Sequence, residues 1–225
     1  MHPDDLANLK QFLEQSLNAL NKMMKYGSDG VGPLVGAKEL SAKYIKNPLL
    51  DTKFKQIDSL RKAELKKNFA SGFVTSIGGA ISLPIAIPSS MAISWILQIR
   101  MVAAMAHIAG YDIEDQAVKT SVALCLLGKK GKELIESDFH ALQQKLTQGH
   151  FYSVPSKTLL MINQKIVAKL TQIAGNKGFS RLGKAIPLAG GLIGGALDYY
   201  NAKETADFAI ELFGFNNLSE TGESL

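Results

Sequence analysis

Charge is missing from one long stretch of this chain, because residues 68–99 contain no Asp, Glu, Lys or Arg. The stretch exceeds the roughly 20 apolar residues that a membrane-spanning helix needs. Gly78, Gly79, Pro84 and Pro88 interrupt it, however, and proline both removes a backbone donor and disfavours helix in the residue before it. This pattern excludes a simple single span.

We therefore predict two helices, at about 66–78 and 88–109, joined by an uncharged corner at 79–87. Such a hairpin is either buried in protein or inserted into lipid, and the sequence leaves both alternatives open. A second apolar segment, residues 185–197, is also free of charge but has too few residues to cross a bilayer.

The chain is equally poor in the residues that catalysis and metal binding require. Its one cysteine, Cys125, excludes an internal disulfide and a cysteine-rich metal site. No Gly-x-Ser-x-Gly motif is present, and the N-terminus lacks the features of a signal peptide, which favours a cytoplasmic location. The scattered histidines do not form ligand pairs: His2, His107, His140 and His150. We predict no catalytic residues, no metal and no cofactor.

A phosphate-binding loop is also excluded. Residues 178–185 nearly match its pattern, but the final Ser or Thr is replaced by Ala185, and no strand precedes the segment. The basic regions lack interleaved aromatic residues, so nucleic acid is not an expected partner.

No convincing alternating strand pattern is found in the 225 residues, and we predict an all-α fold with a single helical domain. The domain contains the central hairpin and a C-terminal glycine-rich helix. We place an N-terminal amphipathic helix and loop at 1–34, the helical domain at 35–215 and a flexible acidic tail at 216–225. The remaining predicted helices cover 4–25, 37–45, 51–65, 113–127, 131–148, 156–175 and 198–213.

The net charge of +5 conceals an asymmetry, because residues 198–225 carry six acids and one lysine and the rest of the chain carries the basic excess. Basic residues precede both apolar segments, as contact with anionic lipid requires: Arg61, Lys62, Lys66 and Lys67 before the first, and Lys177, Arg181 and Lys184 before the second. The alternative is that these basic residues form an ordinary solvent-exposed surface that contacts no lipid.

Two further features concern the interior. Gly190 and Gly194, with Gly191 and Gly195, form overlapping spacings that allow close helix packing. Arg100 ends the charge-free stretch on an otherwise apolar helix, so we expect a structural ion pair with a carboxylate. The candidate partners are Asp112, which we also expect to cap the next helix, Asp115 and Asp198.

Two blocks of sequence resemble the signatures of the EcsC family. The first block comprises Gly72-Phe73, Gly78-Gly79, Leu83-Pro84, Ile87-Pro88, Trp95, Gln98-Ile99-Arg100 and the segment 106–112; the second comprises 184–195, Ala206 and Phe213. The resemblance covers about residues 35–215. It implies a bacterial, helical, membrane-associated and non-catalytic accessory protein, and the family is named after a protein encoded beside an ABC exporter.

The leading hypothesis is thus a cytoplasmic protein that associates peripherally with the membrane and binds anionic phospholipid or an acyl chain. The alternatives are a soluble scaffold for a protein partner such as an ABC transporter subunit, and an enzyme acting on lipid. The expected lipid contacts are Arg61, Lys62, Lys66, Lys67, Pro84, Ile85, Ile87, Pro88, Met91, Trp95, Lys177, Arg181 and Lys184.

Overall fold

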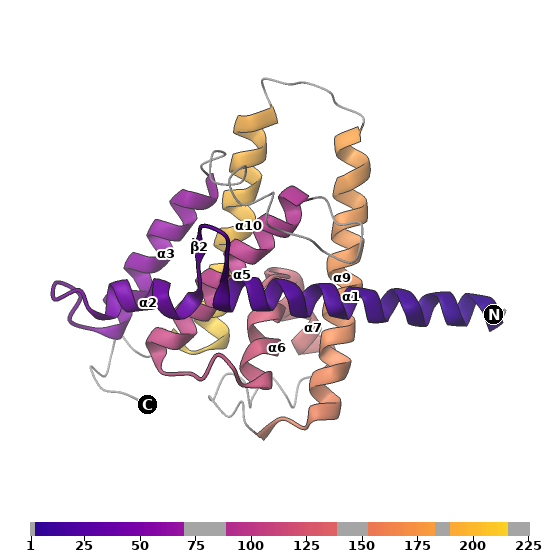
Figure 1. The fold of residues 1–225 in the computed structure, drawn as a ribbon, viewed down its shortest axis with the longest axis horizontal. Coiled ribbons are helices and arrows are strands. Elements are labelled where there is room, and N and C mark those ends of the chain that lie inside the picture. Colours follow the sequence, from indigo (N-terminus) through magenta and orange to yellow (C-terminus); the bar gives the residue numbers. More distant parts are fainter. Residues whose placement is uncertain (1–2, 70–88, 139–152, 183–189, 216–225) are drawn as a thin grey trace.

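The computed structural model describes residues 3–69, 89–138, 153–182 and 190–215, which form an all-α domain, as predicted (Figure 1). Two two-residue strands, β1 (Gly30–Val31) and β2 (Leu34–Val35), form a small antiparallel hairpin. The helices are α1 (Pro3–Asp29), α2 (Ala37–Ile45), α3 (Lys53–Phe69), α5 (Ser89–Ala109), α6 (Gln116–Cys125), α7 (Lys129–Asp138), α9 (Ser156–Leu182) and α10 (Gly190–Leu212).

Helix α5 forms the centre of the domain, and α1, α2, α3, α6 and α10 pack around it. Every residue from Met91 to Ala106 is buried, so this helix is apolar on all sides because protein surrounds it on all sides. Its bounds agree with the predicted helix at 88–109. The first arm of the predicted hairpin beyond Phe69, and its corner, lie outside the described residues.

Helix α1 crosses the front of α5 and α9, and its N-terminal part projects beyond the body of the domain (Figure 1). Leu20, Met23 and Met24 join the core where α1 crosses α5. Gly27 permits the close approach of the two helices, since a Cβ atom at this position would lie 2.5 Å from Cγ2 of Ile99.

The chain between α1 and α2 differs from the prediction, in which a helix at 4–25 is followed by a loop. Helix α1 continues to Asp29, and the β1–β2 hairpin follows it. Gly32 opens the two-residue turn with φ +55°, a conformation that glycine adopts without strain and that two-residue hairpins require. The strands are too short for an alternating sequence pattern to reveal them.

The start of α6 also differs from the prediction. The N-cap is Asp115, whose carboxylate accepts hydrogen bonds from the backbone N–H groups of Ala117 and Val118. Asp112, the predicted cap, lies three residues earlier and accepts from the backbone N–H of Glu114 within the preceding turn. Both residues have the chemistry of an N-cap, and the sequence pattern alone does not choose between them.

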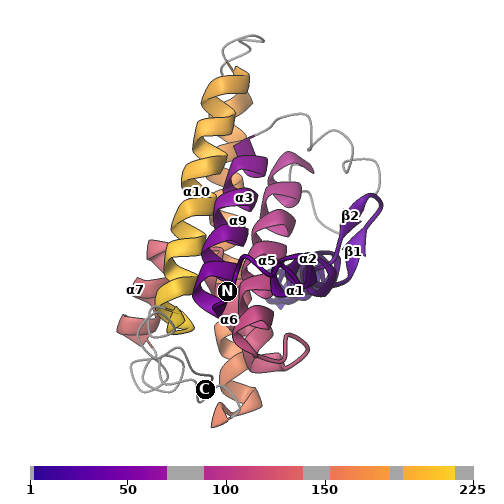
Figure 2. The ribbon, with the colours of Figure 1, turned by 90° about the vertical axis from the view of Figure 1, so that its left-hand side faces the viewer.

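Four helix ends point towards the same end of the molecule. The C-terminal ends of α3 and α9 and the N-terminal ends of α5 and α10 lie towards the top of both views (Figures 1 and 2). We call this the upper end and define it by Phe69, Leu182, Ser89 and Gly190. These four residues border the chain segments 70–88 and 183–189, which contain residues 70–88 of the first apolar stretch and residues 185–189 of the second.

Candidate functional site

A buried ion pair joins α3 to α5 below the upper end. Nη2 of Arg100 bonds Oε2 of Glu64, and both side chains are almost fully buried, with 3% and 0% of their surfaces exposed. Nζ of Lys67 lies 2.8 Å from the other carboxylate oxygen of Glu64, and Nη1 of Arg100 is 3.5 Å from the carbonyl oxygen of Val35. Burial lowers the pKa of Arg100, while the charge and hydrogen bond of Glu64 raise it.

The expected structural ion pair of Arg100 is therefore present, but its expected partners were wrong. Asp112 is exposed in the turn after α5, and Asp115 caps α6. Glu64 is the last acid before the charge-free stretch, and Arg100 is the first charge after it. A helical hairpin brings those two positions together, so the signal was present in the sequence.

A second buried polar network joins α5 to α10. Thr205 donates to Oε1 of Gln98 at 2.7 Å, and Nε2 of Gln98 donates to the hydroxyl of Ser94 at 3.1 Å. All three side chains are buried. These polar residues of the apolar stretch are therefore satisfied by the protein itself and fix the register of α5 against α10.

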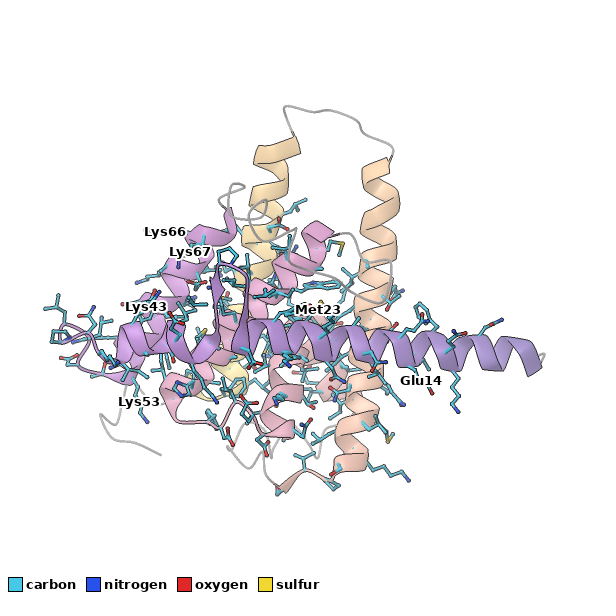
Figure 3. The ribbon with its side chains drawn as sticks, viewed as in Figure 1. Glu14, Met23, Lys43, Lys53, Lys66 and Lys67 are labelled. Atoms are coloured by element: carbon cyan, nitrogen blue, oxygen red, sulfur yellow. The ribbon has the colours of Figure 1, made fainter. Side chains whose placement is uncertain are left out.

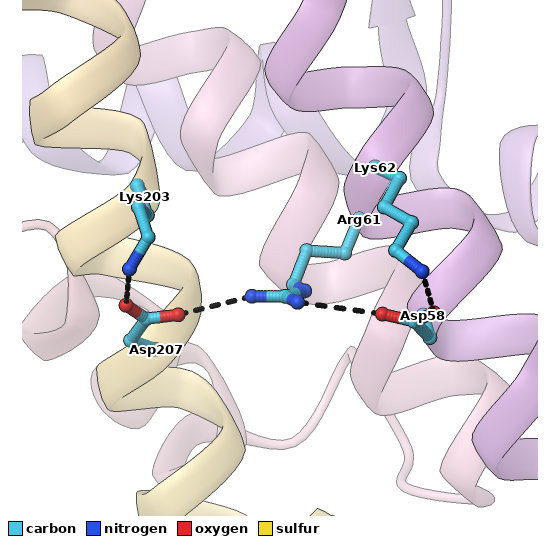
Figure 4. A network of polar contacts seen from close by, with 5 residues as sticks. All are labelled: Asp58, Arg61, Lys62, Lys203 and Asp207. Atoms are coloured by element: carbon cyan, nitrogen blue, oxygen red, sulfur yellow. Dashed lines mark hydrogen bonds and ion pairs between the residues drawn. The ribbon is translucent and has the colours of Figure 1, made fainter.

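Two basic residues of α3, Arg61 and Lys62, form ion pairs with acids of α3 and α10 (Figure 4). Arg61 contacts Asp58 at 3.3 Å and Asp207 at 3.0 Å, and Lys62 contacts Asp58 at 2.6 Å. Lys203 approaches Asp207 from the other side at 2.5 Å. Arg61, with 22% of its side chain exposed, thus holds α3 against α10 rather than facing solvent.

The acidic C-terminal part of the chain also forms ion pairs with basic residues elsewhere in the fold, which accounts for part of the charge asymmetry of the sequence. Acids of α10 pair with basic residues of α7, with Lys129 lying 3.4 Å from Glu204 and Lys132 lying 2.6 Å from Glu211. Hydrogen bonding to these carboxylates raises the pKa of both lysines. Part of the basic excess that we assigned to an anionic partner is therefore neutralised within the fold.

Lys66 remains as a cation directed away from the core near the upper end. It is exposed and has no ion-pair partner among the described residues, whereas its neighbour Lys67 is paired with Glu64. Figure 3 places both lysines near the C-terminal end of α3. Lys62 and Lys67 keep 66% and 45% of their side chains exposed, so an anionic surface can reach them despite their ion pairs.

Met91 and Trp95, two of the expected lipid contacts, are buried in the core with 7% and 6% exposed. The segment Met91–Ala109 is long and apolar enough to cross a membrane, but 94% of it is buried inside the protein. Neither residue is available to a lipid surface in this conformation. This arm of the predicted hairpin is the core helix of the domain.

The remaining predicted site residues are only partly described. Lys177 and Arg181 lie in the last turns of α9, and Gly190, Gly191, Gly194 and Gly195 lie in the first turns of α10, but the packing around them lies outside the described part of the structure. Outside the described residues altogether are Pro84, Ile85, Ile87, Pro88 and Lys184.

Sequence reasoning missed an exposed apolar surface on α10. Ala196, Leu197, Tyr199 and Tyr200 are all exposed, and Leu197 and Tyr200 are about half exposed at 52% and 51%. Four exposed residues within five positions show that much of this part of α10 faces outward, although the side chain of Tyr200 contacts Lys129 at the start of α7. The adjacent tyrosines at the end of the apolar segment were the available signal, because tyrosine favours the boundary between apolar and aqueous surroundings.

The described residues offer little for catalysis. They contain no group of three or more His, Cys, Asp or Glu residues that could hold a metal ion. Ser41 and His107 lie 2.8 Å apart through Oγ and Nδ1, but the Ser41 hydroxyl is fully buried and also bonds the carbonyl oxygen of Lys38. A substrate cannot reach this hydroxyl, so the contact joins α2 to α5 and has a structural role.

Comparison with known proteins identifies the family. The model of the EcsC protein family matches residues 8–215, nearly the whole chain, and this family is not known for an enzymatic activity. Comparisons with curated proteins and with solved structures gave no match. The match extends from α1 to the last residues of α10 and includes both apolar segments, and the chain therefore belongs to the EcsC protein family.

Proposed function

We propose that this protein binds anionic lipid surfaces peripherally, on the cytoplasmic face of a membrane, and docks through its upper end. The observation that carries the proposal is the convergence of the four helix ends that border the two apolar segments (Figures 1 and 2). Segments separated by about a hundred residues in the sequence begin and end on one side of the molecule. A single flat surface can therefore meet the four described helix ends.

The exposed surface of α10 supports this orientation. Leu197, Tyr199 and Tyr200 follow the glycine-rich turns of α10 and precede the part of the helix that packs against α3. Tyrosine prefers the headgroup level of a bilayer, where its ring contacts acyl chains and its hydroxyl contacts water. The two tyrosines mark the depth at which α10 would pass from lipid to water.

Charge supports an anionic surface over a neutral one. Lys66 is unpaired among the described residues, and a partly exposed ion pair such as that of Lys62 with Asp58 contributes little to stability. Lys62 can exchange its carboxylate for a lipid phosphate at small cost. Each basic residue near an anionic membrane contributes about 1 kcal/mol to binding.

Vesicle flotation tests the proposal directly. The full chain should float with vesicles that contain phosphatidylglycerol and much less with pure phosphatidylcholine vesicles. Lys66→Glu should weaken binding to the acidic vesicles by about tenfold, because the substitution replaces attraction by repulsion. Equal recovery of the protein in the soluble fraction with both vesicle types would overturn the proposal.

The chain offers a matched control for the aromatic surface. Tyr199→Ser with Tyr200→Ser should reduce vesicle binding by about tenfold or more through the loss of apolar contact. Leu160 and Met161 are similarly exposed, at 51% and 47%, but lie near the start of α9, far from the upper end. Leu160→Ser with Met161→Ser should leave binding unchanged, and an equal loss in both double variants would contradict the proposed orientation.

A second candidate function is a soluble scaffold for an acidic protein partner, such as a transporter subunit. The burial of Met91 and Trp95 favours it, because this arm of the hairpin needs no lipid to cover it. Protein-free vesicles separate the two functions. A scaffold would ignore acidic vesicles, whereas the lipid-binding protein would bind them without any partner.

A further inference from the structure

A cavity of about 350 Å³ lies where α1, α6 and α9 meet, away from the upper end. This volume falls at the lower end of the range of small-molecule sites. The position is independent of the proposed lipid-binding surface. Its walls come from three helices that are distant in the sequence. The chemistry of the side chains on these walls indicates that the cavity could bind a ligand.

The inner part of the cavity contains an unsatisfied hydroxyl. Ser28 is 7% exposed and lines the cavity, and its Oγ has no hydrogen-bond partner among the described residues. Buried polar groups in folded proteins are nearly always hydrogen-bonded, and a molecule bound in the cavity could supply the partner that this hydroxyl lacks. Near it, the amide of Asn163 donates to the hydroxyl of Thr120 at 3.2 Å, and both residues also line the cavity.

The rim of the cavity carries one cation and one anion that the fold does not neutralise. Lys25 and Asp29 stand one turn apart on α1, both are exposed, and neither has an ion-pair partner among the described residues. The other charged pair behaves differently, because Glu114 is bonded by Lys119 at 2.9 Å and by Lys38 at 3.2 Å. The unneutralised charges are therefore of opposite sign and close together.

Apolar side chains complete the wall. Leu20, Met24 and Ala123 belong to the hydrophobic core and also line the cavity. The cavity thus combines a positive group, a negative group, an unpartnered hydroxyl and an apolar surface. A ligand that carries only one charge would leave either Lys25 or Asp29 unpaired at the rim.

We propose that this cavity binds a small zwitterion, namely an α-amino acid with an apolar side chain. Its carboxylate would lie towards Lys25 and accept from the Ser28 hydroxyl, its ammonium group would lie towards Asp29, and its side chain would contact Leu20 and Met24. Binding involves no covalent step. The inference does not depend on lipid binding, and failure of one proposal leaves the other standing.

Titration of the ¹⁵N-labelled full chain with L-leucine, followed by NMR, tests the site. Saturable shifts of the side-chain amide signals of Asn21 and Asn163 are expected, because both residues line the cavity. Two matched probes each lack one charge: 4-methylpentanoate has no ammonium group and 3-methylbutylamine has no carboxylate. Each should bind about tenfold more weakly than leucine.

Substitutions of residues that line the cavity test which side chains contribute to leucine binding. Ser28→Ala, Lys25→Met and Asp29→Asn should each weaken leucine binding several-fold, and Lys22→Met serves as the control. Lys22 lies on the same helix over the ring of Tyr26 and does not line the cavity. No saturable shift at about 10 mM leucine, where a millimolar site would be mostly occupied, would overturn the proposal. Equal affinity for all three probes, or an equal loss in Lys22→Met, would also overturn it.

Discussion

Helix α5 and the first half of α10 are both apolar in sequence, yet the fold treats them in opposite ways. Residues 91–106 of α5 are all buried, whereas four of the five residues from Ala196 to Tyr200 in α10 are exposed. Both helices begin at the upper end and follow an uncharged segment. The difference lies in their neighbours, because α1, α2, α3, α6 and α10 surround α5, whereas most of residues 196–200 of α10 face solvent.

This comparison shows that hydropathy identifies an apolar helix but does not say what covers it. A core helix and a lipid-inserting helix of equal length satisfy the same test of composition. The polar residues of the segment are more informative. Arg100 and Gln98 in α5 have partners inside the protein, as a buried helix requires, and the exposed part of α10 ends in two tyrosines.

The largest expected effect comes from breaking the buried ion pair of α5. Glu64→Gln leaves the guanidinium of Arg100 buried without its counter-charge, and we expect the free energy of unfolding to fall by about 3–5 kcal/mol. Urea unfolding followed by circular dichroism measures the change. The double variant Glu64→Gln with Arg100→Met should recover most of the loss, since it buries no charge.

An exposed pair provides the control for this prediction. Asp51 and Lys55 lie 2.7 Å apart with more than half of each side chain exposed, and Asp51→Asn should leave the free energy of unfolding nearly unchanged. A loss of the same small size in Glu64→Gln would show that Arg100 reaches water and that α5 is less enclosed than the structure indicates.

A smaller effect is expected where α1 covers α5. Gly27→Ala places a Cβ against the side chain of Ile99 and should cost about 1–3 kcal/mol through overpacking. In an Ile99→Ala background the closest obstructing atom is gone, while Cβ of residue 99 and the backbone nitrogen of Arg100 stay at 3.0 and 3.1 Å, so the same substitution should cost less. A double-mutant cycle on unfolding free energies measures this coupling, and equal costs in both backgrounds would contradict the close contact.

The C-terminal end of α5 supplies a pH dependence. Burial, with a further contribution from Lys38, lowers the pKa of His107 below its usual value of 6.5. The unfolded chain therefore takes up a proton at a higher pH than the folded chain does. This contribution to stability is complete above pH 6.5 and is lost as the pH falls from 6.5 towards the depressed pKa.

His107→Gln removes the titrating group and keeps a side chain able to bond Ser41. The difference in unfolding free energy between wild type and variant should be constant above pH 7 and should change below about pH 6.5, with the wild type losing stability faster. A difference that stays constant across the whole range would show that His107 titrates normally in the folded protein.

The smallest effect on stability is expected in the exposed part of α10. Tyr199→Ser with Tyr200→Ser should change the free energy of unfolding by less than about 1 kcal/mol, because exposed side chains contribute little to the fold. Urea unfolding checks this value. A loss of several kcal/mol would mean that the tyrosines pack against the body. The exposed part of α10 would then resemble the buried helix α5 rather than differ from it.

The sequence predicted the all-α class, the bounds of α2 and nearly those of α5, because helical periodicity and proline positions are local signals. It did not predict Glu64 as the partner of Arg100, since that choice depends on how two helices pack. It also assigned Arg61 to a lipid surface, although Asp207 of α10 binds it. An ion pair between residues so far apart has no local signature, and basic faces that meet lipid or protein look alike in sequence.

The central claim is that the exposed surface at residues 196–200 of α10 meets an anionic lipid surface, and a fluorophore placed there tests it most directly. Cys125 is fully buried and burial raises its thiol pKa, so a new exposed cysteine can be labelled selectively. An environment-sensitive dye at Ala196→Cys should shift to blue emission with phosphatidylglycerol vesicles, and the same dye at Leu160→Cys should not. An unchanged spectrum at position 196 in vesicle-bound protein, or an equal shift at both positions, would contradict the account.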